Sequence, residues 1–235
     1  MPYVDAQLPD GTRLHAVLAP IAVDGTSIAL RVPRRRPFTL NALVEAGTVD
    51  AVGAGWLAAI VQARLAFLVS GGTGCGKTTI LSCLLGLVPS RERILLVEDS
   101  AELRPDHPHV VRLQARTANL EGAGQVTMRD LIRQSLRMRP DRVVVGEVRG
   151  AEVVDLLTAM NTGHEGGCGT VHANSAGDVP ERLEALGLLA GLERHALHAL
   201  MAAGIDAGIH LRRLVDGGHL RICLLYTSPS PRDQR

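Results

Sequence analysis

The sequence has few aromatic residues and no excess of charge of one sign. Its 235 residues include two Phe, two Tyr and one Trp, and its 25 basic side chains stand against 24 acidic ones, a formal net charge of +1. Single-strand nucleic-acid binders stack bases on aromatic rings, and duplex binders present basic surfaces to phosphates. The chain as a whole has neither feature, so we expect no direct contact with nucleic acid.

Long apolar runs and paired cysteines are also lacking. No uncharged apolar stretch approaches the ~18 residues that indicate a transmembrane helix, and no charged segment followed by an apolar one opens the chain like a signal peptide. The four cysteines, Cys75, Cys83, Cys168 and Cys223, lie far apart without a C-x-x-C pair. Their spacing indicates neither a zinc site nor a disulfide framework. The sequence predicts a cytoplasmic protein, at most peripheral to a membrane.

The length suits one large domain or one and a half, at about 100 to 200 residues per domain. Residues 1–37 are β-rich, with two short apolar runs joined at the turn signal Asp24-Gly25 and a basic linker, Arg34-Arg35-Arg36-Pro37, at their end. Two strands are not stable alone, so we interpret this region as the C-terminal part of a small α+β N-terminal domain. We expect residues 38–226 to form the main domain and residues 227–235, which have no apolar period, to be disordered.

From Thr39 the pattern turns helical, and strand-like apolar runs then alternate with helical segments. The predicted strands are 65–70, 94–98, 110–114, 142–146, 169–172, 207–214 and 219–226. The predicted helices between and after them are 78–87, 128–138, 151–161, 180–189 and 195–203. Continuous apolar triplets at 95–97 and 143–145 are typical of strands that a parallel sheet buries on both faces. We therefore expect an α/β domain with a mostly parallel sheet.

One glycine-rich run fits the pattern G-x-x-x-x-G-K-[ST] of a phosphate-binding loop, and it lies between a predicted strand and a predicted helix, as that loop requires. Its backbone N–H groups and the helix N-terminus would face phosphate oxygens. Lys77, the only lysine among 25 basic residues, would reach the β- and γ-phosphates as a compact ammonium, and the Thr78 hydroxyl would help to hold Mg²⁺. The predicted nucleotide-binding residues are Gly71, Gly72, Thr73, Gly74, Cys75, Gly76, Lys77, Thr78 and Thr79.

Carboxylates stand at the ends of two predicted strands. Glu98 ends one strand and Asp99 directly follows it, with Glu102 about one turn further, and Glu147 directly follows another strand. Ligands of open α/β sheets bind at the carboxyl ends of strands, so we expect these acids beside the phosphate loop. They would hold Mg²⁺, partly through water, and orient the attacking water. The predicted metal-binding residues are Thr78, Glu98, Asp99 and Glu147.

Four ordered motifs within about residues 9–215 carry a family resemblance. They are Gly-Gly-Thr-Gly-x-Gly-Lys-Thr-Thr from Gly71, Val-Glu-Asp-x-Ala-Glu-Leu from Val97, Leu-Arg-Met-Arg-Pro-Asp-Arg-Val-Val-Val-Gly-Glu-Val-Arg-Gly from Leu136, and Met-Asn-Thr-Gly-His-Glu-Gly from Met160 with Thr-Val-His-Ala-Asn-Ser from Thr170. Together they resemble the secretion ATPases of type II and type IV systems, and most of all the tight-adherence (Tad/CpaF-like) pilus ATPases. The resemblance implies a RecA-like P-loop NTPase core.

The resemblance also implies roles for particular residues. The run from Gly71 to Thr79 corresponds to the Walker A loop, Glu98, Asp99 and Glu102 to the "Asp box", Glu147 to the Walker B strand end, and His172 to the "His box". Members of the family are hexameric motors that use ATP and Mg²⁺ and work with an inner-membrane platform protein. Arginines of their N-terminal domain reach the nucleotide of a neighbouring subunit, which makes Arg13 and Arg31 the candidates here.

Other functions remain open on the sequence. A P-loop kinase for a small molecule would need an acceptor pocket and a lid, and no segment resembles a lid. An ATP-binding regulatory module without turnover does not need the intact set of Lys77, Thr78, Glu98 and Glu147. A conjugation or DNA-uptake motor of the same family remains an alternative to pilus assembly or protein secretion. Cys75 departs from the usual loop residue, and an exposed thiol beside Lys77 would be open to oxidation.

Overall fold

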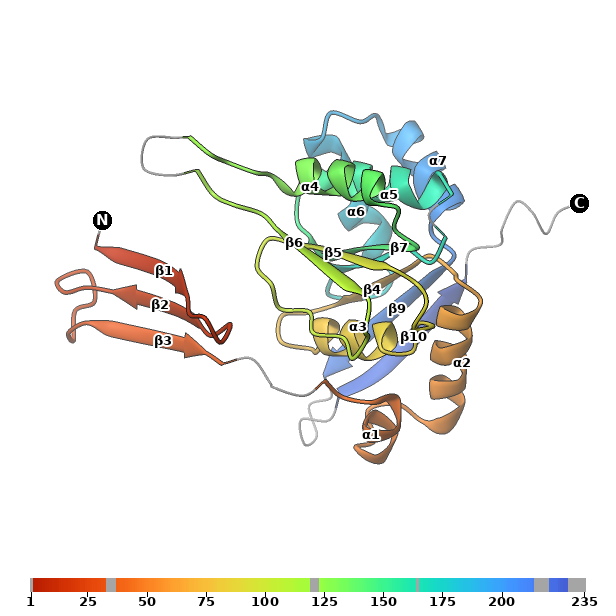
Figure 1. Cartoon of the computed structure of the whole chain (residues 1–235), viewed down its shortest axis with the longest axis horizontal. Coiled ribbons are helices and arrows are strands. Elements are labelled where there is room, and N and C mark those ends of the chain that lie inside the picture. Colours follow the sequence, from red (N-terminus) through yellow and green to blue (C-terminus); the bar gives the residue numbers. More distant parts are fainter. Residues whose placement is uncertain (1, 33–36, 119–122, 164, 214–219, 228–235) are drawn as a thin grey trace, which may run out of the picture. The chain divides into compact units, whose positions relative to one another are not determined.

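The computed structural model describes residues 2–32, 37–118, 123–163, 165–213 and 220–227 (Figure 1). The chain divides into two compact units, Met1–Arg36 and Pro37–Arg235. The expectation of a disordered end falls on residues 228–235, outside the described residues, while Thr227 belongs to the last strand. Among the described residues, no helix has both the length and the apolar character needed to cross a bilayer.

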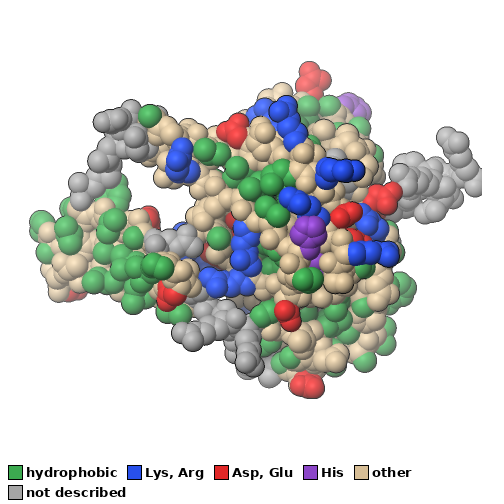
Figure 2. All heavy atoms as spheres, viewed as in Figure 1, with side chains coloured by type: hydrophobic (Ala, Val, Ile, Leu, Met, Phe, Trp, Pro, Cys, Tyr) green, Lys and Arg blue, Asp and Glu red, His purple; other side chains and the backbone are tan. Residues whose placement is uncertain are grey.

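The first unit is a three-stranded antiparallel sheet of β1 (Tyr3–Gln7), β2 (Arg13–Val17) and β3 (Ser27–Arg31). The sequence pattern predicted only the second and third strands. β1 pairs along its full length with β2, and its alternation of apolar and polar residues is too short to stand out by itself. One face of this sheet is apolar, and Figure 2 shows hydrophobic side chains gathered on the unit; Val4, Ile28 and Leu30 are exposed.

The second unit opens with two helices, α1 (Leu40–Glu45) and α2 (Ala51–Gln62), and continues with a seven-stranded sheet in the order β10-β9-β4-β8-β7-β5-β6. Only the pairing of β10 with β9 is antiparallel, which confirms the predicted α/β fold with a mostly parallel sheet. The strands are β4 (Phe67–Gly71), β5 (Ile94–Glu98), β6 (Val110–Gln114), β7 (Arg142–Val148), β8 (Cys168–His172), β9 (Ala207–Arg213) and β10 (Leu220–Thr227). The helices between them are α3 (Lys77–Leu85), α4 (Met128–Ser135), α5 (Glu152–Asn161), α6 (Val179–Leu189) and α7 (Arg194–Gly204).

Helices cover both faces of this sheet, with α2 and α3 on one side and α4 to α7 on the other (Figure 1). Successive residues of β4 contribute side chains to the cores on both faces of the sheet. Phe67 and Val69 join the core beneath α2 and α3, whereas Leu68 joins the core beneath α5 and α6. Every residue of β4 and β5 is buried, as expected for strands whose side chains enter a core on either face.

A buried ion pair fixes the start of β7. The Arg142 side chain is almost fully buried, and its Nε donates to Glu92 Oε2 at 2.7 Å while Nη2 donates to the Val61 carbonyl at 2.8 Å. Glu92 also contacts Arg64, with 3.1 Å between Oε1 and Nη1. The charges therefore satisfy each other in a region that excludes water, at the edge of the sheet opposite the carboxyl ends of the strands.

The ends of two predicted elements differ in the structure, and the second difference affects the site. The predicted helix 128–138 begins with a capping box of Thr127 and Asp130, but its last turn, Leu136–Met138, tightens into a 3₁₀ helix. The strand predicted to end at Gly146 continues to Val148. Glu147 is therefore part of a strand and its direction is set by the sheet, whereas the sequence placed it just past the strand end.

Candidate active site

The phosphate loop runs from the last residue of β4, Gly71, to the first turn of α3. Gly74 and Gly76 have positive φ angles of 71° and 88°, in the left-handed region that favours glycine. At Gly71 a Cβ atom would lie 2.5 Å from the Cys75 sulfur and 2.6 Å from the Leu211 carbonyl oxygen. Gly74 and Gly76 are thus needed for the backbone conformation of the loop, and Gly71 is needed for its close packing.

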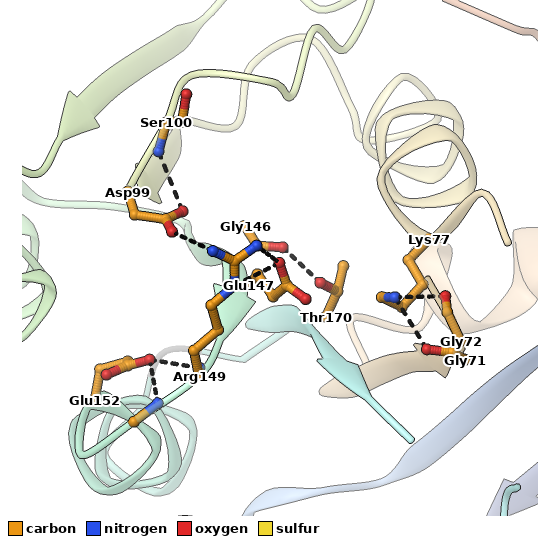
Figure 3. A network of polar contacts seen from close by, with 11 residues as sticks. Gly71, Gly72, Lys77, Asp99, Ser100, Gly146, Glu147, Arg149, Glu152 and Thr170 are labelled. Carbon is orange, nitrogen blue, oxygen red and sulfur yellow. Dashed lines mark hydrogen bonds and ion pairs between the residues drawn. The ribbon is translucent and has the colours of Figure 1, made fainter. Parts of the chain in front are cut away.

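Lys77 begins α3 and turns back across the loop (Figure 3). Its ammonium donates to the carbonyls of Gly71 and Gly72, each at 2.9 Å, and only 9% of the residue is exposed. Thr78 and Thr79 follow in the first helical turn and are half-buried. No side chain caps the start of α3, so its first N–H groups remain directed toward the loop. The residues predicted to bind nucleotide therefore form one cradle.

The exposure of one cysteine, Cys75, differs from the expectation. Cys75 was expected to expose its thiol beside Lys77, but only 4% of the residue is exposed, because the side chain packs beneath Gly71. Burial raises the pKa of the Cys83 thiol to about 11 and that of Cys168 to about 12. These two thiols are therefore protonated and unreactive at neutral pH.

Glu98, the last residue of β5, is buried at the carboxyl edge of the sheet, with 3% exposed. Its Oε1 accepts the backbone N–H groups of Glu102 at 3.0 Å and Leu103 at 2.9 Å. Burial raises the pKa of Glu98 from 4.5 to about 7, although these two N–H groups act in the opposite direction. Gly146 of the neighbouring strand lies against it, since a Cβ there would be 2.7 Å from Glu98 Cγ.

Glu147 and Asp99 meet through an arginine that the sequence reasoning did not single out. Arg149 Nε donates to Glu147 Oε2 at 2.8 Å, and Nη2 donates to the same oxygen. Its third guanidinium nitrogen, Nη1, donates to Asp99 Oδ2 at 3.0 Å (Figure 3). Arg149 follows the last residue of β7, and its position two residues after Glu147 was the available signal in the sequence.

His172 is the last residue of β8 and pairs in register with Gly71 of β4, so the "His box" residue lies beside the beginning of the phosphate loop. Thr170, two residues earlier, donates from its hydroxyl to the Gly146 carbonyl at 2.7 Å. On the other side of β4, the Ser70 hydroxyl and His210 Nδ1 are 2.9 Å apart in the buried interior. Burial lowers the pKa of His210, a residue that the sequence left without a role.

The two candidate arginines of the first unit lie directly opposite each other. Arg13 of β2 and Arg31 of β3 are partners in the antiparallel register, and both are exposed. Asp5 and His15 occupy the same polar face, with 2.8 Å between Asp5 Oδ1 and His15 Nδ1. The sequence analysis named Arg13 and Arg31 as separate candidates. The strand register shows that they form a cross-strand pair of like charge.

The predicted metal residues supply hard oxygen donors of the kind that Mg²⁺ prefers. Thr78 offers a hydroxyl next to the phosphate loop, and Asp99 and Glu147 offer carboxylates that are not fully buried. Glu98 has one oxygen engaged with backbone N–H groups. Among the described residues no group of three or more His, Cys, Asp or Glu gathers as a metal cluster. Mg²⁺ is commonly bound by one or two carboxylates together with substrate phosphates and water, and these residues fit that pattern.

Comparison with known proteins shows which family the chain belongs to. The family model described as "Type II/IV secretion system protein" matches residues 1–210. This chain belongs to that family. The match confirms the predicted membership of the type II/IV secretion family.

Named relatives and solved structures agree with this membership. A Mycobacterium tuberculosis protein whose name refers to conjugal transfer is 60% identical over 90% of this chain, which spans 62% of that protein. The type IV secretion system protein PtlH of Bordetella pertussis is 35% identical over 94% of this chain and 73% of its own length. The VirB11 ATPase of Brucella suis is 30% identical with a TM-score of 0.67, covering 97% of this chain and 74% of that one. The pilus retraction motor PilT, 23% identical over 98% of this chain and 64% of that one, shares the fold with a TM-score of 0.70.

Proposed function

We propose that residues 38–226 form the ATPase domain of a hexameric motor that powers pilus assembly or protein secretion from the cytoplasmic face of the bacterial inner membrane. The observation that supports this best is the closed phosphate loop with its lysine, set at the same sheet edge as the acids of β5 and β7. The proposal includes the tight-adherence pilus system and docking on an inner-membrane platform protein. It rests on the motifs that carry the resemblance.

In this proposal the loop backbone and the start of α3 bind the phosphates of ATP. Lys77 exchanges its two carbonyl partners for β- and γ-phosphate oxygens, which keeps its ammonium paired throughout. Thr78, Asp99, Glu98 and Glu147 are the residues that would hold Mg²⁺, partly through water. When bound, the metal would neutralise negative charge on the phosphates.

We assign the orientation of the attacking water to Glu147 and a supporting role to Glu98. Glu98 is buried, its pKa of about 7 leaves much of it protonated at neutral pH, and its Oε1 accepts the backbone N–H groups of Glu102 and Leu103. Glu147 is half-buried on the adjacent strand, where one oxygen is held by Arg149. To His172, which pairs in register with Gly71, we assign a response to the γ-phosphate.

Substitution of two residues tests the assignment. We expect Lys77→Ala to lose nucleotide binding and Glu147→Gln to bind ATP but to hydrolyse it about 100-fold more slowly. Arg194→Met is a matched control, because Arg194 forms an exposed ion pair with Glu184 between α6 and α7. Hydrolysis at the wild-type rate in Glu147→Gln would contradict the role given to this residue.

We further propose that Arg13 and Arg31 complete the site of a neighbouring subunit, because trans arginines stabilise the γ-phosphate in many P-loop enzymes. Mixing Lys77→Ala chains with Arg31→Ala chains would create some interfaces with an intact loop and an intact arginine, so activity should reappear. A mixture that assembles into rings yet stays inactive would exclude Arg31 as the trans arginine.

A conjugation motor is the second candidate, and the 60% identical mycobacterial relative favours it by its name. Both candidates predict ATP hydrolysis, so DNA distinguishes them. Stimulation of the ATPase rate by single- or double-stranded DNA at physiological salt would favour conjugation. An unchanged rate with DNA, together with binding to a pilus platform protein, would favour pilus assembly.

A further inference from the structure

Arg149 connects the ends of two neighbouring strands through its guanidinium. It lies directly after β7 and contributes two N–H groups to Glu147 of that strand and one to Asp99, which follows β5. Its side chain is 63% exposed, whereas that of Glu147 is 23% exposed. In Figure 3 it lies on the side of Glu147 away from Lys77. The arginine therefore approaches the acid from outside the phosphate cradle.

The backbone that carries Arg149 is itself held in place. Glu152 Oε1 accepts the N–H of Arg149 at 2.6 Å and the N–H of Gly150 at 2.8 Å. Glu152 is the first residue of α5, whose N-cap residue, Ala151, makes no side-chain cap. One carboxylate therefore satisfies two N–H groups just ahead of the helix and fixes the point from which Arg149 projects.

The bonds of Arg149 constrain the orientation of Glu147. Both N–H groups donate to Oε2, so Oε1 takes no part in the pair. A planar guanidinium with several donors in fixed directions can hold one carboxylate oxygen and reach a second acid at once, which a lysine ammonium on a flexible stem does not reproduce. The positive charge also offsets repulsion between Glu147 and Asp99.

We propose that Arg149 is a positioning residue for hydrolysis, which holds Glu147 at one oxygen and ties it to Asp99 so that the other oxygen stays aimed at the attacking water. This rests on the proposed function, in which Glu147 orients that water. Ion pairs at exposed positions contribute little to folding stability, so the arginine acts on geometry. Its removal should therefore lower turnover while leaving the fold and nucleotide binding in place.

The test compares Arg149→Met and Arg149→Lys with wild type and with the control Arg194→Met, using the full chain. We expect Arg149→Met to lower kcat about 10- to 100-fold, the range that follows from losing the orientation of a catalytic group. KM and the Kd of a fluorescent ATP analogue should change less than about threefold, and the melting temperature by less than about 3 °C. Arg149→Lys should recover only part of kcat, and Arg194→Met should match wild type.

A double variant separates positioning from an independent effect. If Arg149 acts through Glu147, adding Arg149→Met to Glu147→Gln should lower kcat by less than about twofold further, because coupled residues are not additive. The inference is overturned by wild-type kcat in Arg149→Met, by a rise in KM with unchanged kcat, by fully additive losses, or by a fall in melting temperature that accounts for the lost activity. Absence of ATPase activity in wild type would instead overturn the proposed function itself.

Discussion

Glu98 offers the sharpest quantitative prediction, because its carboxyl is buried and its pKa is raised to about 7. Glu98→Gln replaces it with a neutral group of nearly the same shape. The amide oxygen can still accept the N–H groups of Glu102 and Leu103 that Oε1 accepts in the wild-type protein. The substitution therefore removes the ionisation while leaving the local hydrogen bonds available.

The direction of the pH dependence follows from whether the folded or the unfolded chain binds the Glu98 proton more tightly. Between about pH 4.5 and pH 7 the folded chain keeps the proton on Glu98 while the unfolded chain releases it, so the free energy of unfolding falls as the pH rises through this window. The two pKa values differ by about 2.5, and each pKa unit corresponds to about 1.4 kcal/mol. Glu98 therefore destabilises the wild-type fold by up to about 3 kcal/mol above pH 7, and by nothing below pH 4.5.

Urea unfolding at pH 5, 6, 7 and 8, in buffers containing EDTA, measures this difference. We expect Glu98→Gln to lie close to wild type at pH 5 and to gain about 2 to 3 kcal/mol over it by pH 8, equivalent to about 4 to 12 °C in melting temperature. Glu45→Gln is the control, because Glu45 is exposed on α1. A gap between Glu98→Gln and wild type that stays constant from pH 5 to pH 8 would refute the reasoning.

Three substitutions test other parts of the structure. Gly146→Ala places a Cβ 2.7 Å from Glu98 Cγ, so it should cost about 1 to 3 kcal/mol in urea unfolding and also reduce ATP turnover. Thr127→Ala removes the capping box of α4 and should cost about 1 kcal/mol in the same assay, with turnover unchanged. Glu92→Gln leaves the buried Arg142 without its carboxylate, and a loss of about 3 to 5 kcal/mol is expected; a loss below 1 kcal/mol would show that the pair is not desolvated.

Local signals in the sequence were sufficient for the central sheet and the phosphate loop. The run Ile94–Glu98 is continuously apolar before its acid because both faces of β5 are buried, and the structure gives the strand those bounds. The loop glycines are needed where the backbone takes positive φ angles, so the glycine spacing itself encodes the curve. The capping box at Thr127 is likewise a local feature, since it involves only four consecutive residues.

The contacts that the sequence did not predict depend on which strands are neighbours in the sheet. Arg149 and Asp99 are 50 positions apart in the chain, and they meet because β7 pairs with β5. The buried position of Cys75 follows from the turn of the loop beneath Gly71 and from the nearby Leu211 of β9. No periodicity within one segment carries such information, since it is fixed by the order in which strands assemble into the sheet.

The single lysine has a practical consequence for measurement. Lys77 lies inside the phosphate cradle, so a nucleotide analogue bearing an amine-reactive acyl group at its terminal phosphate would find one side-chain amine to modify, at the very place where it binds. The mass increment on one peptide would then report how many chains hold nucleotide. Unmodified ATP added in competition would turn the same readout into a titration, carried out on the native sequence without any substitution.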